Sequence, residues 1–317
     1  VIVEPALWFV MARSVMAGHR RWLLADAIVA TGAAVALIGL IGFAMGHSVI
    51  TTEGVRRLAS IYPSPDNLGL LLDRIVPVAA GVALFGLGRR RLWYGGATIP
   101  MLLAALLTFS KGSWLALAAA GLVLGIRHRT IAIASAIVIV ALVGAAIALP
   151  VTRVRLLGAT SMERVWLWQS SVTMIRDHPV FGIGLDQFLY TYPRYRLANA
   201  WREPFLSHPH NLVLDVWLTL GLAGLAWLGW TMYRILERLR RLATSAVGDE
   251  RALLAGLGAG FAAALAHGMV DNALFLPDLA ILFWAFLVLL DGPLSTPVQL
   301  AATSPTPIME DRLVTVG

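Results

Sequence analysis

Long apolar runs, separated by short polar segments, follow one another along the chain. A run of about 17 to 25 apolar residues is long enough to cross the roughly 30 Å hydrocarbon core of a bilayer as a helix. The pattern predicts membrane-spanning helices over the stretches 1–17, 23–46, 68–88, 92–109, 112–126, 130–150, 211–232, 252–271 and 275–291. We therefore expect an all-α fold, a polytopic bundle of transmembrane helices.

The longest polar interruption, residues 151–210, is too long and too patterned to be a bare linker. Thr160 and Glu163 have the spacing of a capping box, which predicts that a helix starts there. We expect its apolar face to lie on the membrane surface or on the top of the bundle. That face carries Val165, Trp168, Val172 and Ile175, and the glycines of the following VFGIGLDQF predict a turn.

Clusters of arginine distinguish the two sides of the membrane. Short loops rich in Lys and Arg stay in the cytoplasm. When the spans alternate, one side receives Arg20–Arg21, Arg89 to Arg91, Arg127 with Arg129, and the segment 234–251. The loop 151–210 also carries arginines, but long loops cross the membrane largely regardless of charge. The other side, where we expect the chemistry, receives 47–67, 110–112, 151–210 and 271–278.

These assignments divide the chain into four parts. Residues 1–150 hold transmembrane helices, 151–210 form a large, partly helical extracytoplasmic loop with an amphipathic helix, and 211–292 hold the C-terminal transmembrane helices. Residues 293–317 are expected to be a disordered cytoplasmic tail. We expect a multi-pass protein of the cytoplasmic (inner) membrane whose site faces the periplasm or the exterior.

Composition supports a membrane protein. Hydrophobic residues make up 58% of the 317, charged residues only 14%, and the mean hydropathy is +0.77. The net charge of +7 does not indicate nucleic acid as a partner, because the basic residues form short clusters between apolar stretches. There is no cysteine, which excludes disulfides and thiolate metal ligands. Because the chain opens on Val1 without a charged leader, we expect it to be part of a longer polypeptide.

Two histidines and an asparagine stand at the edge of the apolar stretch LSHPHNLVLDVWLTLGLAGLAWLG, residues 206–229. An imidazole at His210 is suited to take a proton from an attacking hydroxyl. The alternative is a histidine at a helix entry that bonds to backbone or to a lipid headgroup. His208 is a candidate for orienting His210 or an acceptor, and Asn211 is a candidate for substrate contact or for a helix cap.

This stretch resembles the signature of the superfamily of O-antigen ligases, O-antigen polymerases and protein O-oligosaccharyltransferases. The signature is a His-Asn pair, nine residues, and Gly-x-x-Gly, matched by His210, Asn211, Gly221 and Gly224. Three further landmarks follow the family's order over about residues 60 to 290. They are SPDNLGLLLDR (64–74), where Asp66 precedes the asparagine in place of the common proline, LTFSKGSWLAL (107–117), and ERVWLWQSSVTMIRDHPVFGIGLDQF (163–188).

The resemblance implies a GT-C-like membrane glycosyltransferase. Such an enzyme transfers a glycan from a polyprenyl-pyrophosphate donor to an acceptor hydroxyl at the outer leaflet, without a metal or other cofactor. The hydroxyl belongs to a lipid core, to the growing glycan or to a protein, which leaves ligase, polymerase and protein-glycosylating activities open. Membrane lipid is the remaining expected partner.

A departing pyrophosphate must be neutralised by Arg, Lys or a metal. Asp215, Asp271 and Asp278 are the only nearby acids, without the dense carboxylate set that Mg²⁺ sites often use, so fixed cations are expected to serve. The candidates are Lys111, which stands where the family has Arg, Arg164, and, as weaker assistants, Arg74 and Arg202.

Each cation also has an alternative role. Lys111, the only lysine of the chain, is equally suited to snorkel at the interface, and Arg164 to lie on the surface. Arg74 and Asp73 fall inside an apolar run, where a local ion pair is the simpler interpretation. The arginines and aromatics of YTYPRYR and ANAWREP suit sugars and phosphates, or a membrane interface.

Asp271 and Asp278 are expected to cap helices, and His267 to pack or to hydrogen-bond between helices. The rival class for the whole protein is a non-catalytic membrane transporter or a lipid- or glycan-binding protein.

Overall fold

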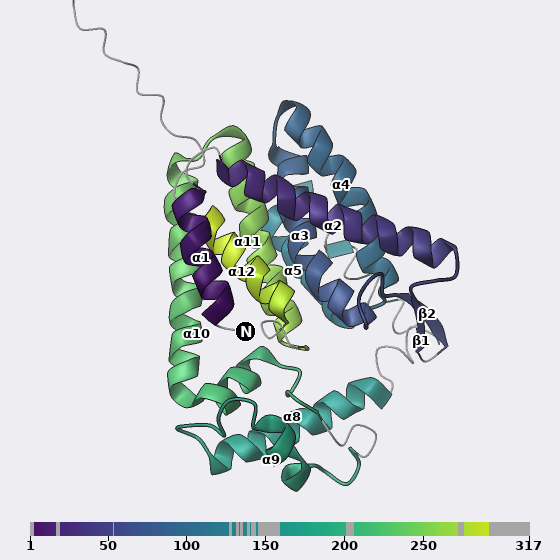
Figure 1. The fold of residues 1–317 in the computed structure, drawn as a ribbon, viewed down its shortest axis with the longest axis vertical. Helices are drawn as coiled ribbons and strands as arrows, with labels where there is room; N and C mark the ends of the chain where they lie inside the picture. The colour runs from purple at the N-terminus through teal and green to yellow at the C-terminus, as the bar shows by residue number, and fades with distance from the viewer. Residues whose placement is uncertain are drawn as a thin grey trace, which may run out of the picture.

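A computed structural model gives the fold of the chain (Figure 1). It describes residues 3–16, 20–52, 54–126, 159–200, 206–271 and 276–291, with a few isolated positions between 129 and 144. The elements are α1 (Val3–Val15), α2 (Arg20–Ala44), β1 (Val49–Thr52), β2 (Val55–Leu58), α3 (Pro65–Phe85), α4 (Gly88–Leu107), α5 (Lys111–Gly125), α8 (Ala159–Asp177), α9 (Phe188–Tyr195), α10 (Leu212–Ser245), α11 (Gly248–Gly268) and α12 (Pro277–Leu289).

The predicted all-α membrane fold is confirmed. Helices α2, α3 and α10 are each long and apolar enough to cross a membrane, and α5 and α12 are shorter apolar helices. Helices α1, α4 and α11 overlap three further predicted spans, and their crossing of the bilayer stays a prediction. The predicted span 130–150 falls mostly outside the described residues, as do Arg202 and the tail 293–317.

Helix α3 is the central helix of the bundle. It is buried along most of its length and packs against α11, α4, α5 and α2. Its contact with α11 is close because glycines meet there: a β-carbon on Gly81 would lie 2.6 Å from the Gly256 Cα. Small residues at such a crossing let the two backbones approach closely and gain dispersion contacts. Helices in a membrane depend on these contacts, because lipid tails are as apolar as the helix interface and burial alone does not drive association.

A polar network lies inside this core. Arg74 donates to the Leu70 carbonyl and lies 3.4 Å from Asp73, so the simpler interpretation, a local ion pair, is confirmed. His267 of α11 hydrogen-bonds through Nδ1 to Asp73, and Ser113 of α5 donates to the same carboxylate at 3.3 Å. The interhelical bond expected of His267 is therefore present, and it joins α3, α5 and α11.

The bundle has two chemically different ends. Helices α3 and α5 begin, and α11 finishes, at the end near the hairpin β1–β2 and helix α8 (Figure 1). At the other end Asp249 of α11 accepts from the Leu87 N–H at 2.7 Å and lies 3.6 Å from Arg90. Arg90, from one of the predicted cytoplasmic clusters, thus lies at the end opposite α8.

Helices α8 and α9 and the start of α10 form a small unit below the bundle in Figure 1. Its core consists of Leu167, Met174, Ile175, Phe188, Tyr192 and Leu218. The predicted helix is present as α8, but it begins at Ala159, so Thr160 lies inside it rather than at its N-cap. The predicted apolar face is only partly right. Val165 and Val172 are each 38% exposed, because α8 packs on α9 and α10 through a neighbouring face.

Helix α10 is broken at Gly221, which has φ 65° and ψ −155°. The predicted span 211–232 lies in α10, but a kink divides this helix: residues 212–220 pack with α8, and the long helix runs from 222 to 245. The loop after α8 fills the break, since the Leu222 N–H donates to the Val180 carbonyl at 2.9 Å and Ile183 N–H to Leu218 at 2.6 Å. That loop contains the predicted turn, with positive φ at Gly182 and Gly184.

The signature glycine Gly221 therefore provides a backbone turn. We expect Gly221→Ala to lower the free energy of unfolding by about 1–3 kcal/mol, because alanine is strained at positive φ and its β-carbon would overlap the Val180 carbonyl oxygen. Thermal unfolding in detergent measures the change. Gly229→Ala, on the same helix with open space around it, is the matched control and should be neutral or slightly stabilising. Equal stability of the two variants would contradict this role.

Candidate functional site

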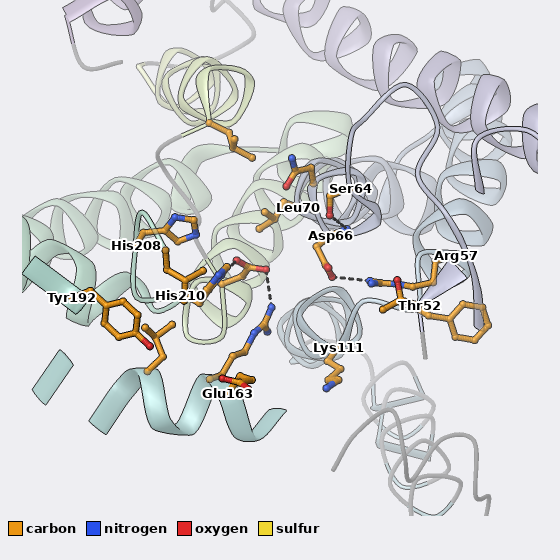
Figure 2. A pocket seen from close by; sticks show the side chains of 17 residues that line it. Thr52, Arg57, Ser64, Asp66, Leu70, Lys111, Glu163, Tyr192, His208 and His210 are labelled. Carbon is orange, nitrogen blue, oxygen red and sulfur yellow. Dashed lines mark hydrogen bonds and ion pairs between the residues drawn. The ribbon is translucent and has the colours of Figure 1, made fainter. Parts of the chain in front are cut away.

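A polar cavity of about 340 Å³ lies at the starts of α3 and α5 (Figure 2). Helix α8 and the segment 206–210 form its other walls. It is on the α8 side of the bundle, where the sequence predicted the chemistry. Its lining includes three cations and three acids: Arg57, Lys111, Arg164, Asp66, Glu163 and Asp271. The remaining lining residues are Thr52, Ser64, Asn67, Leu70, Phe109, Leu167, Tyr192, Leu206, His208, His210 and Leu276.

The carboxylate of Asp271 joins a histidine and an arginine. The His210 Nδ1 lies 2.6 Å from Asp271 Oδ1, and the Arg164 Nη2 donates to Asp271 Oδ2 at 3.1 Å. Because Nδ1 faces the carboxylate, it carries the proton when the imidazole is neutral, and Nε2 is left as the basic nitrogen. The predicted His210 and Arg164 are thus brought together by an acid from the end of α11.

Ionised Asp271 is strongly favoured in the fold. Burial alone would raise the pKa of this carboxyl, but the hydrogen bond from His210 and the charges of His210 and Arg164 lower it well below its usual value. The resulting contribution to stability is complete above the unfolded-state pKa near 3.8 and is lost as the pH falls below that value. The carboxylate therefore stays negative over the physiological range.

His208 lies edge-on to His210, with ring centroids 4.3 Å apart. Burial, and to a lesser extent the charge of His210, lowers the pKa of His208 to about 4. His208 is therefore neutral near pH 7 and accepts or donates through an uncharged ring. Its Nδ1 lies 2.9 Å from the Ser207 hydroxyl, which leaves Nε2 for a ligand.

The backbone holds the histidine segment in a fixed conformation. His210 has φ 49°, a left-handed value that is rare for residues other than glycine. The Trp168 indole N–H of α8 donates to the Pro209 carbonyl at 3.1 Å. After His210, Asn211 caps α10: its side-chain oxygen accepts from the Val213 and Leu214 N–H groups at 3.0 Å each, and its amide donates to the Met269 carbonyl at 2.8 Å. Strain at His210 is thus maintained by bonds on both sides of it.

Lys111 is the first residue of α5 and lines the cavity (Figure 2). Its ammonium donates to the Ser161 hydroxyl of α8, so the start of α5 is tied to the helix that carries Arg164. Phe109, two residues earlier, has φ 49°, and this turn aims the start of α5 at the cavity. A helix N-terminus adds its own partial positive charge to that of the lysine.

The hairpin β1–β2 contributes a cation that the sequence analysis did not predict. Its strands pair antiparallel with Val49 opposite Leu58. Arg57 is only 5% exposed; its Nη2 donates to Asp66 at the start of α3 at 2.9 Å, and its Nε donates to the Thr108 carbonyl at 2.7 Å. The β-branched run before Gly54 was the available signal for a hairpin.

The remaining predicted site residues lie elsewhere. Arg74 is buried one turn or more deeper in α3, in the polar network of the core, and does not line the cavity. Asn211 acts as a helix cap and is also absent from the lining. Arg202 lies outside the described residues. Asp271, expected only to cap a helix, is instead the residue that joins His210 to Arg164.

The same residues raise the question of a metal ion. Ligand atoms of His208, His210 and Asp271 lie within 4.8 Å of one another, a clustering that their spacing in the sequence did not reveal. However, Asp271 already accepts from Arg164 and His210, and the guanidinium of Arg164 repels a cation at this position. The donor set therefore favours a proton-transfer pair with a fixed cation over an ion site.

A search of curated proteins finds no sequence that matches the chain. The sequence model of one protein family, described as O-antigen ligase, matches residues 96–229, from within α4 to a point in α10 beyond its break at Gly221. The matched region contains Lys111, Arg164, His208 and His210. The match supports an O-antigen ligase-type family for this apolar helical membrane protein, and His210 of the signature lines the cavity described above.

Proposed function

We propose that the protein transfers a glycan from a polyprenyl-pyrophosphate donor to an acceptor hydroxyl without a divalent metal. The observation that carries this proposal is the arrangement of His210, Asp271 and Arg164, in which one carboxylate orients a base and holds a cation beside it. The match to the sequence model of the O-antigen ligase family supports glycan transfer in general. The donor, the acceptor and the role of each residue belong to the proposal.

In this mechanism His210 Nε2 accepts the proton of the acceptor hydroxyl while the hydroxyl oxygen forms a bond to the anomeric carbon. The bond between that carbon and the pyrophosphate oxygen breaks, and the electron pair leaves with the pyrophosphate. Asp271 stabilises the imidazolium that results, as a buried carboxylate does in other His–Asp pairs. No oxidation or reduction takes place.

The leaving pyrophosphate is assigned to the cations of the cavity. Arg164 and Lys111 come from adjoining helix starts, and Arg57 comes from the hairpin, so that they approach from different elements. Each is held by a neighbour, Arg57 by Asp66, Arg164 by Asp271 and Lys111 by Ser161. Cations fixed before the reaction need no reorganisation as charge develops, which is the main source of electrostatic catalysis.

The acceptor is proposed to enter beside the histidines. His208 lines this side of the cavity, and a neutral imidazole suits a polyhydroxylated ligand by hydrogen bonding. The glycan is expected to belong to a cell-envelope polysaccharide such as lipopolysaccharide. Ligase, polymerase and protein-glycosylating activities differ only in which molecule supplies the hydroxyl.

The proposal is tested by transfer from a purified lipid-linked donor to candidate acceptors in detergent or nanodiscs. We expect product to form at an unchanged rate after exhaustive treatment with EDTA, because the charges on the pyrophosphate meet side chains. Mass spectrometry of the product identifies the acceptor class. Loss of transfer on chelation and recovery with Mg²⁺ would overturn metal independence. Transport of a lipid-linked glycan by a protein that never forms product would favour the rival, non-catalytic class.

Lys111 is expected to act mainly through donor binding. In Lys111→Ala the KM for the donor should rise about tenfold or more, as expected when a charged hydrogen bond worth about 1.5–3 kcal/mol is lost. Lys111→Arg, which restores the residue common in the family, should retain most of the activity. Steady-state kinetics on both variants make the comparison, with Arg176→Ala as control, because Arg176 is exposed at the far end of α8. An unchanged KM in Lys111→Ala would leave snorkelling at the interface as the role of Lys111.

A further inference from the structure

A second cavity, of about 560 Å³, opens between α1, α10 and α12 in the half of the bundle remote from the histidines. Apolar and aromatic side chains form most of its wall, and arginines from two helices stand around it. Its lining residues are Phe9, Arg13, Trp227, Trp230, Thr231, Arg234, Ile235, Arg238, Phe283, Trp284, Leu287, Leu290 and Asp291. Nothing in the proposed glycan transfer uses this cavity.

The charge of the described lining is unbalanced. Arg13, Arg234 and Arg238 face a single carboxylate, Asp291, which leaves a surplus of positive charge. Asp291 is engaged by the Arg13 Nε at 2.6 Å, while Arg238 donates through Nε to the Leu290 carbonyl at 2.8 Å. Arg234 lies 3.4 Å from Glu237, which is not part of the lining. Guanidinium groups keep several donors each, so the ends of Arg234 and Arg238 remain able to bind an anion.

The aromatic wall is exposed to the surroundings of the bundle. Trp230 is 60% and Trp227 46% exposed, and the rings of Phe9 and Trp284 meet at a tilt with their centroids 5.0 Å apart. In a helical membrane protein, such outward-facing aromatic surface contacts lipid, and tryptophan is enriched at the level of the headgroups. A narrow apolar crevice continues from the cavity between α10, α11 and α12, and it shares Trp227, Thr231 and Phe283 with it.

We propose that this cavity binds an anionic phospholipid of the leaflet opposite the candidate active site. Its phosphate contacts Arg13, Arg234 and Arg238, and an acyl chain lies along the tryptophans into the apolar crevice. A basic cavity between membrane helices is the known form of sites for acidic lipid headgroups. The lipid occupies the space between α1, α10 and α12, and so stabilises the packing of these helices by binding only the folded protein. This inference is independent of the proposed glycan transfer.

Lipid titration of the full chain in nanodiscs tests the proposal. Discs of phosphatidylcholine receive increasing fractions of phosphatidylglycerol, and native mass spectrometry counts the bound phosphatidylglycerol while thermal unfolding is followed. We expect preferential retention of phosphatidylglycerol and a rise in the unfolding temperature. The double variant Arg13→Gln, Arg234→Gln should lose about thirtyfold in affinity, at about fivefold per arginine near the membrane surface. Both side chains are about 60% exposed, so folding is expected to be retained.

Arg240→Gln is the matched control, because Arg240 is exposed on the same helix but does not line the cavity; its affinity should equal that of the native chain. Unfolding in pure phosphatidylcholine checks that the double variant is folded. Equal retention of phosphatidylcholine and phosphatidylglycerol, or equal loss in the double and control variants, would overturn the proposal. A chain ending at residue 291 should bind phosphatidylglycerol as the full chain does. If only the shortened chain binds this lipid, residues 292–317 occupy the cavity in the full chain and the proposal fails.

Discussion

Replacement of His210 by alanine is expected to lower kcat for glycan transfer by two to four orders of magnitude, the usual contribution of a positioned general base. The variant keeps the cations, so the KM for the donor should change little. The physical reason is that a hydroxyl is a poor nucleophile until a base accepts its proton, and that Asp271 directs His210 Nε2 away from itself for this purpose. Initial rates at saturating donor measure the effect.

His178 offers a matched control for this experiment. It is exposed just after α8, so His178→Ala should leave kcat unchanged. Full activity in His210→Ala would contradict the proposed base and would leave His210 with the alternative role of a backbone or headgroup contact. A fall in kcat accompanied by loss of folding is recognised from thermal unfolding, and His210→Gln, which retains a hydrogen-bonding side chain, then separates catalysis from structure.

The helices were largely predictable from the long apolar runs of the sequence. In lipid, each backbone N–H and C=O group needs a hydrogen-bond partner within the protein, and a helix provides these partners within a single apolar run. The break in α10 was not predictable, because a glycine in an apolar run is also compatible with a straight helix. Gly221 becomes a turn only because the loop 179–184 supplies hydrogen bonds to the freed backbone on both sides of it. The residues that bond to this backbone, Val180 and Ile183, lie far upstream in the chain, so nothing in the sequence around Gly221 indicates the break.

In the candidate site, too, some residues were predictable from the sequence and others were not. Lys111, Arg164 and His210 were predicted from short motifs, and the structure brings all three to one cavity. Arg57 and Asp271 were missed because their roles depend on contacts between distant segments: His210 and Asp271 are 61 residues apart, and Arg164 and Asp271 are 107 apart. Arg74 was a candidate because a charged residue inside a membrane span is usually either functional or paired. In the structure it is paired, with Asp73 and the Leu70 carbonyl as its partners.

Asp271→Asn tests the connection between the base and the cation, and is expected to lower kcat by about two to four orders of magnitude. The amide is uncharged, so it stabilises the imidazolium less, and its NH₂ group can face His210 Nδ1 and favour the wrong tautomer; the corresponding change in a serine-protease triad costs about four orders. Arg164 also loses its ion pair. Asp186→Asn is the control, because Asp186 is exposed and its positive φ is one that asparagine tolerates.

A double-mutant cycle separates a catalytic pair from two independent residues. If Asp271 acts through His210, the double variant His210→Ala, Asp271→Asn should be hardly slower than His210→Ala alone, since residues that work as a unit have non-additive effects. Additive losses would mean that Asp271 acts separately, by fixing Arg164 for the pyrophosphate. In that case the KM for the donor should rise in Asp271→Asn and in Arg164→Ala alike, and the idea of one carboxylate serving both the base and the cation would fail.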